Sequence, residues 1–412
     1  MRKKVQSLAK SALLKDSVIY LAGELLSKAM PFLLLPYLTR MLGTDGFGEL
    51  SYYLAIGAFL LIFMSLSQNG AITRYYYVYG KNGLGNLLLA GGLYSFAIFL
   101  LGVIISILQK SEGFFYCVLI AFLQSLVQNQ LALRQCQKRP FSYFVIQISL
   151  AITNVIFTVG LFYLLNENKV IERLMAISLS YFITFSGAIL LLKKTFDIRI
   201  RPTLKLLKLA IGYIITFGLP LILHALSYTV KGQFDRVLIN ERFSAHELGV
   251  YSAGVQVASV VTVLIMAVNS AGVPYLYERL KTGKIQLAHL HRAFWFSLAV
   301  PIVVTLFAYL LPLSLFTFVL GEAFAPSRFY TVFFVFAFSL TIPYLILVNY
   351  LFYHAKNAQI SACSVISTVV YLLVLWWASV ENMQFVPLAS VISTAILLPL
   401  LYYFTKQIDK KK

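Results

Sequence analysis

Residues 47–71 read FGELSYYLAIGAFLLIFMSLSQNGA, and residues 248–272 read LGVYSAGVQVASVVTVLIMAVNSAG. Each stretch is long and apolar enough to cross the hydrocarbon core of a bilayer, which takes about 20 residues of helix. Aligned without gaps at an offset of 201, Gly48 matches Gly249 and Ser51 matches Ser252. Because this offset is close to half of the 412-residue chain, the match indicates two halves built on one plan.

The composition of the whole chain is typical of a polytopic membrane protein. Hydrophobic residues make up 60%, charged residues only 12%, and the mean hydropathy is +0.82. Soluble domains carry about 25% charged residues, so this class is excluded, and so is a disordered chain. The three cysteines are too few and too scattered for a disulfide framework or a zinc site.

Twelve stretches have the length and polarity of transmembrane helices, and no connection between them is long enough for a soluble domain. The N-terminal sequence MRKKVQSLAK leads into an apolar stretch that is too long for a signal peptide, so this stretch is the first helix. The twelve predicted spans are 17–41, 47–70, 86–108, 114–135, 143–165, 174–192, 210–238, 248–272, 294–319, 330–353, 358–379 and 386–405.

The predicted fold is an all-α integral membrane protein with two six-helix lobes. Residues 1–192 form the first lobe, residues 193–208 a basic cytoplasmic linker, and residues 209–412 the second lobe. Six helices per repeat keep the orientation of each half, so the repeats are related by a pseudo-two-fold axis along the membrane normal. This arrangement encloses a central cavity between the lobes, as in a transporter.

The distribution of Lys and Arg predicts that both termini are cytoplasmic. With the N-terminus inside, 25 of the 34 Lys and Arg residues fall in inside loops and termini, and 8 fall outside. Topology and anionic lipid head groups therefore account for most of the net charge of +19, and nucleic acid is not an expected partner.

Ionisable residues inside predicted spans are the first candidates for a binding site, since they usually face a cavity or a partner. Glu24 and Lys28 lie four residues apart on one helix face, and His224, Lys231 and Asp235 form a second stripe that Arg236 extends. Both groups have two interpretations: structural ion pairs, such as Lys231 with Asp235, or charged walls of the cavity.

Amide side chains form a second set of candidates. Gln124 and Gln128 share a face of the fourth span, and Gln256 lies on a polar face of the eighth. Hydrogen bonding between helices explains each stripe separately. Taken together, several amide-rich stripes favour a hydrated cavity that binds a sugar.

Motifs for catalysis or for cofactor binding are missing from the sequence. There is no HExxH, GxSxG or Walker sequence, and no strand precedes the glycine-containing loop at 80–86. We therefore expect neither an enzyme nor a bound cofactor or metal.

Residues 23–53, GELLSKAMPFLLLPYLTRMLGTDGFGELSYY, resemble the opening of Wzx-type O-antigen and capsule polysaccharide flippases. These belong to the polysaccharide transporter branch of the multidrug/oligosaccharidyl-lipid/polysaccharide exporter superfamily. The residues that carry the resemblance are Pro36, Tyr37, Leu38, Arg40, Leu42, Gly43, Phe47, Gly48, Gly218, Leu219, Pro220, Asp235, Arg236 and the run 247–252.

The resemblance implies a flippase in the bacterial inner membrane that moves undecaprenyl-pyrophosphate-linked oligosaccharide, such as an O-antigen repeat unit for lipopolysaccharide, between the leaflets. Transport could be coupled to H+ or Na+ through Glu24, Asp235 or His224, and the sequence does not decide between these. A polysaccharide polymerase is a candidate partner. The alternatives are a drug/cation antiporter of the same superfamily and a membrane polysaccharide polymerase. Three cations, Lys28, Lys231 and Arg236, argue against the antiporter, and the lack of a large external loop argues against the polymerase.

Overall fold

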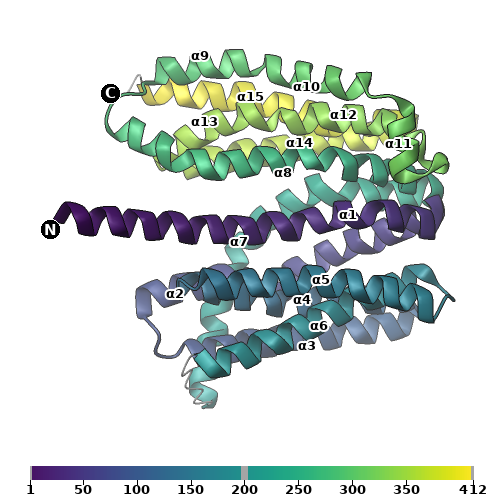
Figure 1. Ribbon diagram of the computed structural model, residues 1–412, viewed down its shortest axis with the longest axis horizontal. Coiled ribbons are helices and arrows are strands. Elements are labelled where there is room, and N and C mark those ends of the chain that lie inside the picture. Colours follow the sequence, from purple (N-terminus) through teal and green to yellow (C-terminus); the bar gives the residue numbers. More distant parts are fainter. Residues whose placement is uncertain (1, 196–202, 410–412) are drawn as a thin grey trace. The chain divides into compact units, whose positions relative to one another are not determined.

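The computed structural model describes the backbone of residues 2–195 and 203–409, and the side chains of residues 18–191 and 203–408. Over these residues the chain is helical and contains no strand (Figure 1). Part of the predicted basic linker, residues 196–202, lies outside the described residues. The predicted all-α fold is therefore confirmed.

The helices follow one another with short connections. The first seven are α1 (Arg2–Ser65), α2 (Gln68–Tyr79), α3 (Leu84–Gln109), α4 (Glu112–Cys136), α5 (Pro140–Leu164), α6 (Lys169–Thr195) and α7 (Leu204–Arg242). The remainder are α8 (Ala245–Lys281), α9 (Leu287–Ser297), α10 (Ala299–Leu310), α11 (Leu313–Leu320), α12 (Ser327–Ser339), α13 (Thr341–Tyr353), α14 (Asn357–Glu381) and α15 (Leu388–Asp409), with short 3₁₀ turns η1 (Glu322–Phe324) and η2 (Met383–Phe385).

Eleven helical stretches of the described chain are long and apolar enough to cross a membrane. The first, Val18–Tyr79, has 62 residues, enough for two crossings of about 20 residues each. Gly43 interrupts the helical geometry of α1 with a φ of 66°, which glycine adopts without strain. Counting one crossing on each side of Gly43 brings the eleven stretches to twelve spans, the number predicted.

Two of the predicted spans have the wrong ends. The second, 47–70, is interrupted because Leu66 and Ser67 have left-handed backbone angles, so α1 ends at Ser65 and α2 begins at Gln68. The ninth, 294–319, takes in the end of α9, all of α10 and most of α11: Leu311, which precedes Pro312, is extended, and α11 follows separately.

The described chain divides by packing into two compact units. Unit 1 takes in described residues within Met1–Leu34 and Tyr53–Leu226, and unit 2 those within Leu35–Tyr52 and Ser227–Lys412. This division runs through α1 and α7 rather than between helices, whereas the predicted lobes divide at the linker. The six-plus-six division stays a prediction.

Each unit is held together by helix packing around apolar side chains. In unit 1, α4 packs against α2, α3, α5 and α6, whose ribbons run alongside one another (Figure 1). In unit 2, α8 packs against α12, and α14 packs against α15. The largest buried cluster of unit 2 includes Tyr251, Phe334 and Tyr371.

Within unit 2, residues that the offset of 201 makes equivalent lie against each other. A Cβ atom on Gly48 would collide with the carbonyl oxygen of Ala245, and a Cβ atom on Gly249 with that of Thr44. The contact is reciprocal, because the offset relates Thr44 to Ala245 and Gly48 to Gly249. Such reciprocity is expected where a local two-fold axis passes between the two segments, and small residues allow the backbones to approach.

Arg40, also in unit 2, connects the first chain segment of this unit to the end of α11. Its guanidinium donates to the carbonyl oxygens of Phe318 and Val319, and to that of Pro36 at 2.9 Å. The last carbonyls of a helix have no partner within the helix, so a cation here satisfies them and favours the helix dipole. Arg40 is therefore a cap for α11.

We expect Arg40→Ala to lower the stability of the folded protein by about 1 kcal/mol, the usual contribution of such a hydrogen bond. The thermal melting temperature of the detergent-purified protein measures this effect. Arg40→Lys should recover part of it, since an ammonium group reaches fewer of the carbonyls. Lys284→Ala, which removes an exposed cation, is the control. Melting of Arg40→Ala at the wild-type temperature would contradict the capping role.

Candidate functional site

In unit 1, Glu24 and Lys28 form the ion pair that their spacing predicts. The Lys28 ammonium donates to Glu24 Oε1 at 2.7 Å, and both side chains are about half exposed. One turn earlier, the Tyr20 ring packs edge-on against Tyr143 of α5, with centroids 5.1 Å apart. The pair is therefore accessible, but its two charges neutralise each other.

The predicted amides of α4, Gln124 and Gln128, are half-buried and make no hydrogen bond to another described residue. A buried polar network lies on other faces. Asn129 donates to Gln68 Oε1 at 2.7 Å, and Gln68 Nε2 donates to Ser95 Oγ at 3.0 Å. This network satisfies its own members and connects α2, α3 and α4, so its role is in helix packing.

Unit 1 also contains two buried arginines whose hydrogen-bond partners are uncharged. Arg173 donates to Asn154 Oδ1 at 2.9 Å and to Thr158 Oγ1, and Arg134 donates to the carbonyl oxygen of Ala188 at 2.9 Å. Neither guanidinium pairs with a carboxylate of the described chain. Neither arginine is among the candidates predicted from the sequence; for Arg173, the spacing of Asn154 and Thr158, four residues apart on α5, is the available signal.

In unit 2, Lys231 does not pair with Asp235, so this structural interpretation was wrong. Its ammonium is half-buried and donates to Ser367 Oγ of α14 at 2.9 Å, and Ser367 in turn donates to the carbonyl oxygen of Ser393 at 2.8 Å. The positive charge of Lys231 therefore has a neutral partner.

Asp235 is buried and has partners of its own. The Tyr251 hydroxyl donates to Asp235 Oδ2 at 2.5 Å, and the backbone N–H of Arg236 donates to Oδ1 at 2.9 Å. The Arg236 guanidinium lies 3.6 Å from Asp235 and donates to Gln233 Oε1 at 2.9 Å. Asp235, Arg236 and Tyr251 thus form a neutralised polar cluster that the sequence indicated only in part, since Tyr251 lies on α8.

Two further predicted residues lack such partners. His224 is exposed on α7, and Gln256 is half-buried on α8; neither side chain forms a hydrogen bond within the described chain. Nothing in the packing assigns a structural role to either residue. Both remain candidates for contact with substrate.

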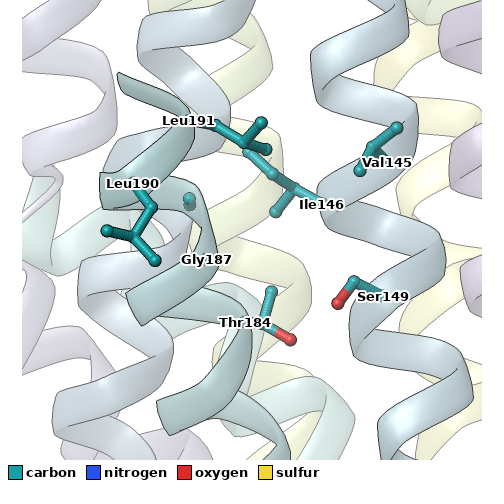
Figure 2. A pocket seen from close by; sticks show the side chains of 8 residues that line it. Val145, Ile146, Ser149, Thr184, Gly187, Leu190 and Leu191 are labelled. Atoms are coloured by element: carbon teal, nitrogen blue, oxygen red, sulfur yellow. The ribbon is translucent and has the colours of Figure 1, made fainter. Parts of the chain in front are cut away.

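A cavity of about 250 Å³ lies between α5 and α6 in unit 1 (Figure 2). Its lining is apolar apart from Ser149 and Thr184, and the Thr184 hydroxyl is buried without a hydrogen-bond partner. Because no charged side chain lines this cavity, it does not provide a site for an anionic group.

Solved structures with the same fold are membrane transporters. The chain matches a structure of a MATE transporter in the straight conformation with a TM-score of 0.59 and 17% identity, over 97% of each chain. It also matches the outward-facing form of a multidrug resistance MATE family transporter (TM-score 0.58, 19% identity, 97% and 95% of the chains). At this identity the similarity defines the fold alone, an arrangement of apolar helices in two lobes.

Relatives at higher identity define the family. Residues 13–280 match the family described as "Polysaccharide biosynthesis protein". A protein of the Lsg locus of Haemophilus influenzae is 41% identical over 96% of this chain and 98% of its own length. An uncharacterized membrane protein of the same organism is 42% identical over 97% and 99%. The chain belongs to the polysaccharide biosynthesis protein family, and the predicted relationship to the Wzx-type flippases and their superfamily is confirmed.

Family and fold together indicate a multi-pass membrane transporter of polysaccharide biosynthesis rather than an enzyme.

Proposed function

We propose that the chain is a flippase that moves undecaprenyl-pyrophosphate-linked oligosaccharide across the bacterial inner membrane by alternating access, with both termini in the cytoplasm. The observation that carries the proposal is Lys231, a cation within a membrane-spanning helix whose hydrogen-bond partner is a neutral serine hydroxyl. A charge inside a membrane is costly and marks a substrate pathway by default. A pyrophosphate group supplies the missing negative charge.

The physical requirements of this substrate fit the chain. A pyrophosphate and several sugars cannot cross hydrocarbon, because each unmatched polar group costs several kcal/mol. Lys28, Lys231, Arg236 and the half-buried amides Gln124, Gln128 and Gln256 would replace water, while the polyprenyl tail stays in lipid. With the inside negative, the membrane potential favours moving about two negative charges outward by about 2.3 kcal/mol per charge per 100 mV.

Coupling to H+ or Na+ is an open part of the proposal. Among the predicted groups, Glu24 and His224 are exposed, whereas Asp235 is buried and already bonded to Tyr251. Glu24 and His224 are therefore the more accessible candidates. A polysaccharide polymerase stays the candidate protein partner, because it would consume the translocated repeat unit.

A drug/cation antiporter is the second candidate function, favoured by the likeness to multidrug MATE structures. It needs a carboxylate that is available to bind a cation. Asp235 is the buried carboxylate of α7, and Arg236 and Tyr251 already occupy it. The flippase therefore accounts better for the charges of unit 2.

Translocation by the purified protein in proteoliposomes tests the two candidates directly. We expect a fluorescent undecaprenyl-pyrophosphate-linked oligosaccharide to change leaflet, and a cationic dye not to be exported. Export of the dye without movement of the lipid-linked oligosaccharide would replace the flippase by the antiporter.

We expect Lys231→Gln to reduce the translocation rate about tenfold, the effect of losing one contact of about 1.4 kcal/mol with pyrophosphate. Glutamine can still donate to Ser367, so the fold should persist. Lys284→Gln, outside the membrane-spanning helices, is the matched control. Wild-type translocation by Lys231→Gln would remove this lysine from the substrate pathway.

A further inference from the structure

Arg74 of unit 1 is an exposed cation held in place by tyrosine. Its Nη1 atom donates to the Tyr213 hydroxyl at 2.9 Å, and its Cζ atom lies 5.8 Å from the centre of the Tyr213 ring. No carboxylate of the described chain forms an ion pair with it. Since a guanidinium has five N–H donors, most of its hydrogen-bonding capacity stays available.

Aromatic rings surround this arginine. Tyr75 and Tyr79 lie 5.1 Å apart on α2, and both meet the Tyr213 ring of α7 edge-on, at 5.6 and 6.1 Å. Phe217 stacks one turn further along α7, 6.3 Å from Tyr213. We call these five residues, Arg74, Tyr75, Tyr79, Tyr213 and Phe217, the Arg74 aromatic cluster.

Two contacts to the loop after α2 fix the cluster. The Tyr75 hydroxyl donates to the carbonyl oxygen of Asn82 at 3.1 Å, and the same hydroxyl fills the space where a Cβ atom of Gly83 would stand. Gly83 has a φ of 81°, which favours glycine. Tyr79, by contrast, is 55% exposed, so one ring face of the cluster is accessible.

The surroundings of the cluster are strongly basic. The end of α4 and the start of α3 pack with α2 and the start of α7 around buried Leu84, Leu133 and Ile214. The segments 70–86, 134–142 and 203–213, which meet at this end of unit 1, contain no Asp or Glu. They carry seven cations: Arg74, Lys81, Arg134, Lys138, Arg139, Lys205 and Lys208. An anionic ligand is therefore favoured here over a cationic or neutral one.

We propose that the Arg74 aromatic cluster of unit 1 binds the headgroup of a glycosyl diphosphate lipid through residues other than Lys231. Arg74 binds the phosphate oxygens through its remaining N–H groups, as guanidinium groups do in bidentate geometry. The accessible face of Tyr79 packs against the apolar face of the first sugar. The proposal rests on the proposed function, because it assigns a docking position to the same substrate.

The competing explanation is an aromatic belt at the membrane–water interface, where tyrosines are common. A belt needs exposed rings but no particular arrangement around an arginine. Tyr77, on the same helix, is 63% exposed and contacts Tyr76 rather than the cluster. It serves as the matched control, since a belt would use Tyr77 and Tyr79 equally.

Native mass spectrometry of the full chain in detergent measures binding of three probes: undecaprenyl pyrophosphate carrying N-acetylglucosamine, undecaprenyl phosphate, and phosphatidylglycerol. We expect the wild type to bind the sugar-bearing lipid most tightly. Arg74→Gln should weaken binding of both undecaprenyl lipids about tenfold. Tyr79→Leu should weaken only the sugar-bearing lipid, Tyr79→Phe should retain it, and Tyr77→Leu should bind as the wild type does.

If Tyr77→Leu and Tyr79→Leu weaken binding of the sugar-bearing lipid equally, the proposal is overturned in favour of an aromatic belt. If Arg74→Gln weakens binding of phosphatidylglycerol as much as binding of the undecaprenyl lipids, the cluster is a general lipid-binding site instead. Wild-type binding by Arg74→Gln and Tyr79→Leu, in a protein that translocates the lipid-linked oligosaccharide, would overturn the site alone. A wild type that neither binds nor translocates it would overturn the proposed function.

Discussion

Gly48→Ala is expected to leave little folded protein, although it adds a single methyl group. The new Cβ atom would overlap the carbonyl oxygen of Ala245 and lie 2.8 Å from the backbone nitrogen of Gly249. Both obstacles are backbone, so no side chain can rotate away, and the two helices must separate. Overpacking costs about 1–3 kcal/mol where side chains can adjust, and we expect a loss at or above the upper end.

Gly57→Ala is the matched control for this prediction. Gly57 lies on the same helix, and a Cβ atom there would meet only the carbonyl oxygen of Cys117, at 4.0 Å. The thermal melting temperature and the monodisperse yield after size exclusion in detergent compare the two variants. Gly249→Ala should behave as Gly48→Ala does, because the contact is reciprocal. If Gly48→Ala and Gly57→Ala have the same melting temperature, the backbones of the two segments do not approach each other so closely.

This contact also shows how much of the fold could be predicted from the sequence. The offset of 201 places Gly48 opposite Gly249 in an alignment, and small residues at equivalent positions are a signal that a sequence can carry. Local pairs are similarly readable: Glu24 and Lys28 lie four residues apart, and the ion pair is formed. The twelve spans follow from the length of apolar stretches, because every helix must cross the same hydrocarbon thickness.

Partners that come from other helices could not be predicted. Lys231 and Asp235 are also four residues apart, yet Lys231 donates to Ser367, which is 136 positions away, and Asp235 accepts from Tyr251. The choice depends on which helices pack together, and helical periodicity gives only the face on which a residue lies. For the same reason the sequence did not reveal that Arg74 and Tyr213, 139 positions apart, would meet.

Breaks within helices could be predicted from the sequence at one position and not at another. Pro312 predicts an interruption, because proline lacks an N–H and disfavours helical angles at the residue before it, so the ninth predicted span should have ended there. The left-handed Leu66 and Ser67 carry no comparable signal, since neither residue favours that conformation.

Asp235→Ala is the second variant for which we expect a large effect. Asp235 is buried, and its removal leaves the Arg236 guanidinium without its counter-charge and the Tyr251 hydroxyl without its acceptor. Breaking a buried ion pair on one side costs about 3–5 kcal/mol, because the remaining charge is not compensated. The melting temperature in detergent should therefore fall strongly. Asp45→Ala is the control, since Asp45 is 78% exposed and lies 3.7 Å from His246.

A double variant separates the loss of the partner from the loss of the carboxylate itself. In Asp235→Ala combined with Arg236→Met, no charge is left unpaired, so much of the stability should return, and the coupling between the two sites should be clearly non-additive. Asp235→Asn should lose less stability than Asp235→Ala, because its amide oxygen can still accept from the Arg236 N–H while its NH2 group donates to the Tyr251 hydroxyl. If Asp235→Asn folds and also translocates at the wild-type rate, the negative charge of Asp235 has no part in translocation. A melting temperature of Asp235→Ala equal to that of Asp45→Ala would instead show that this cluster contributes little to the fold, contrary to its burial.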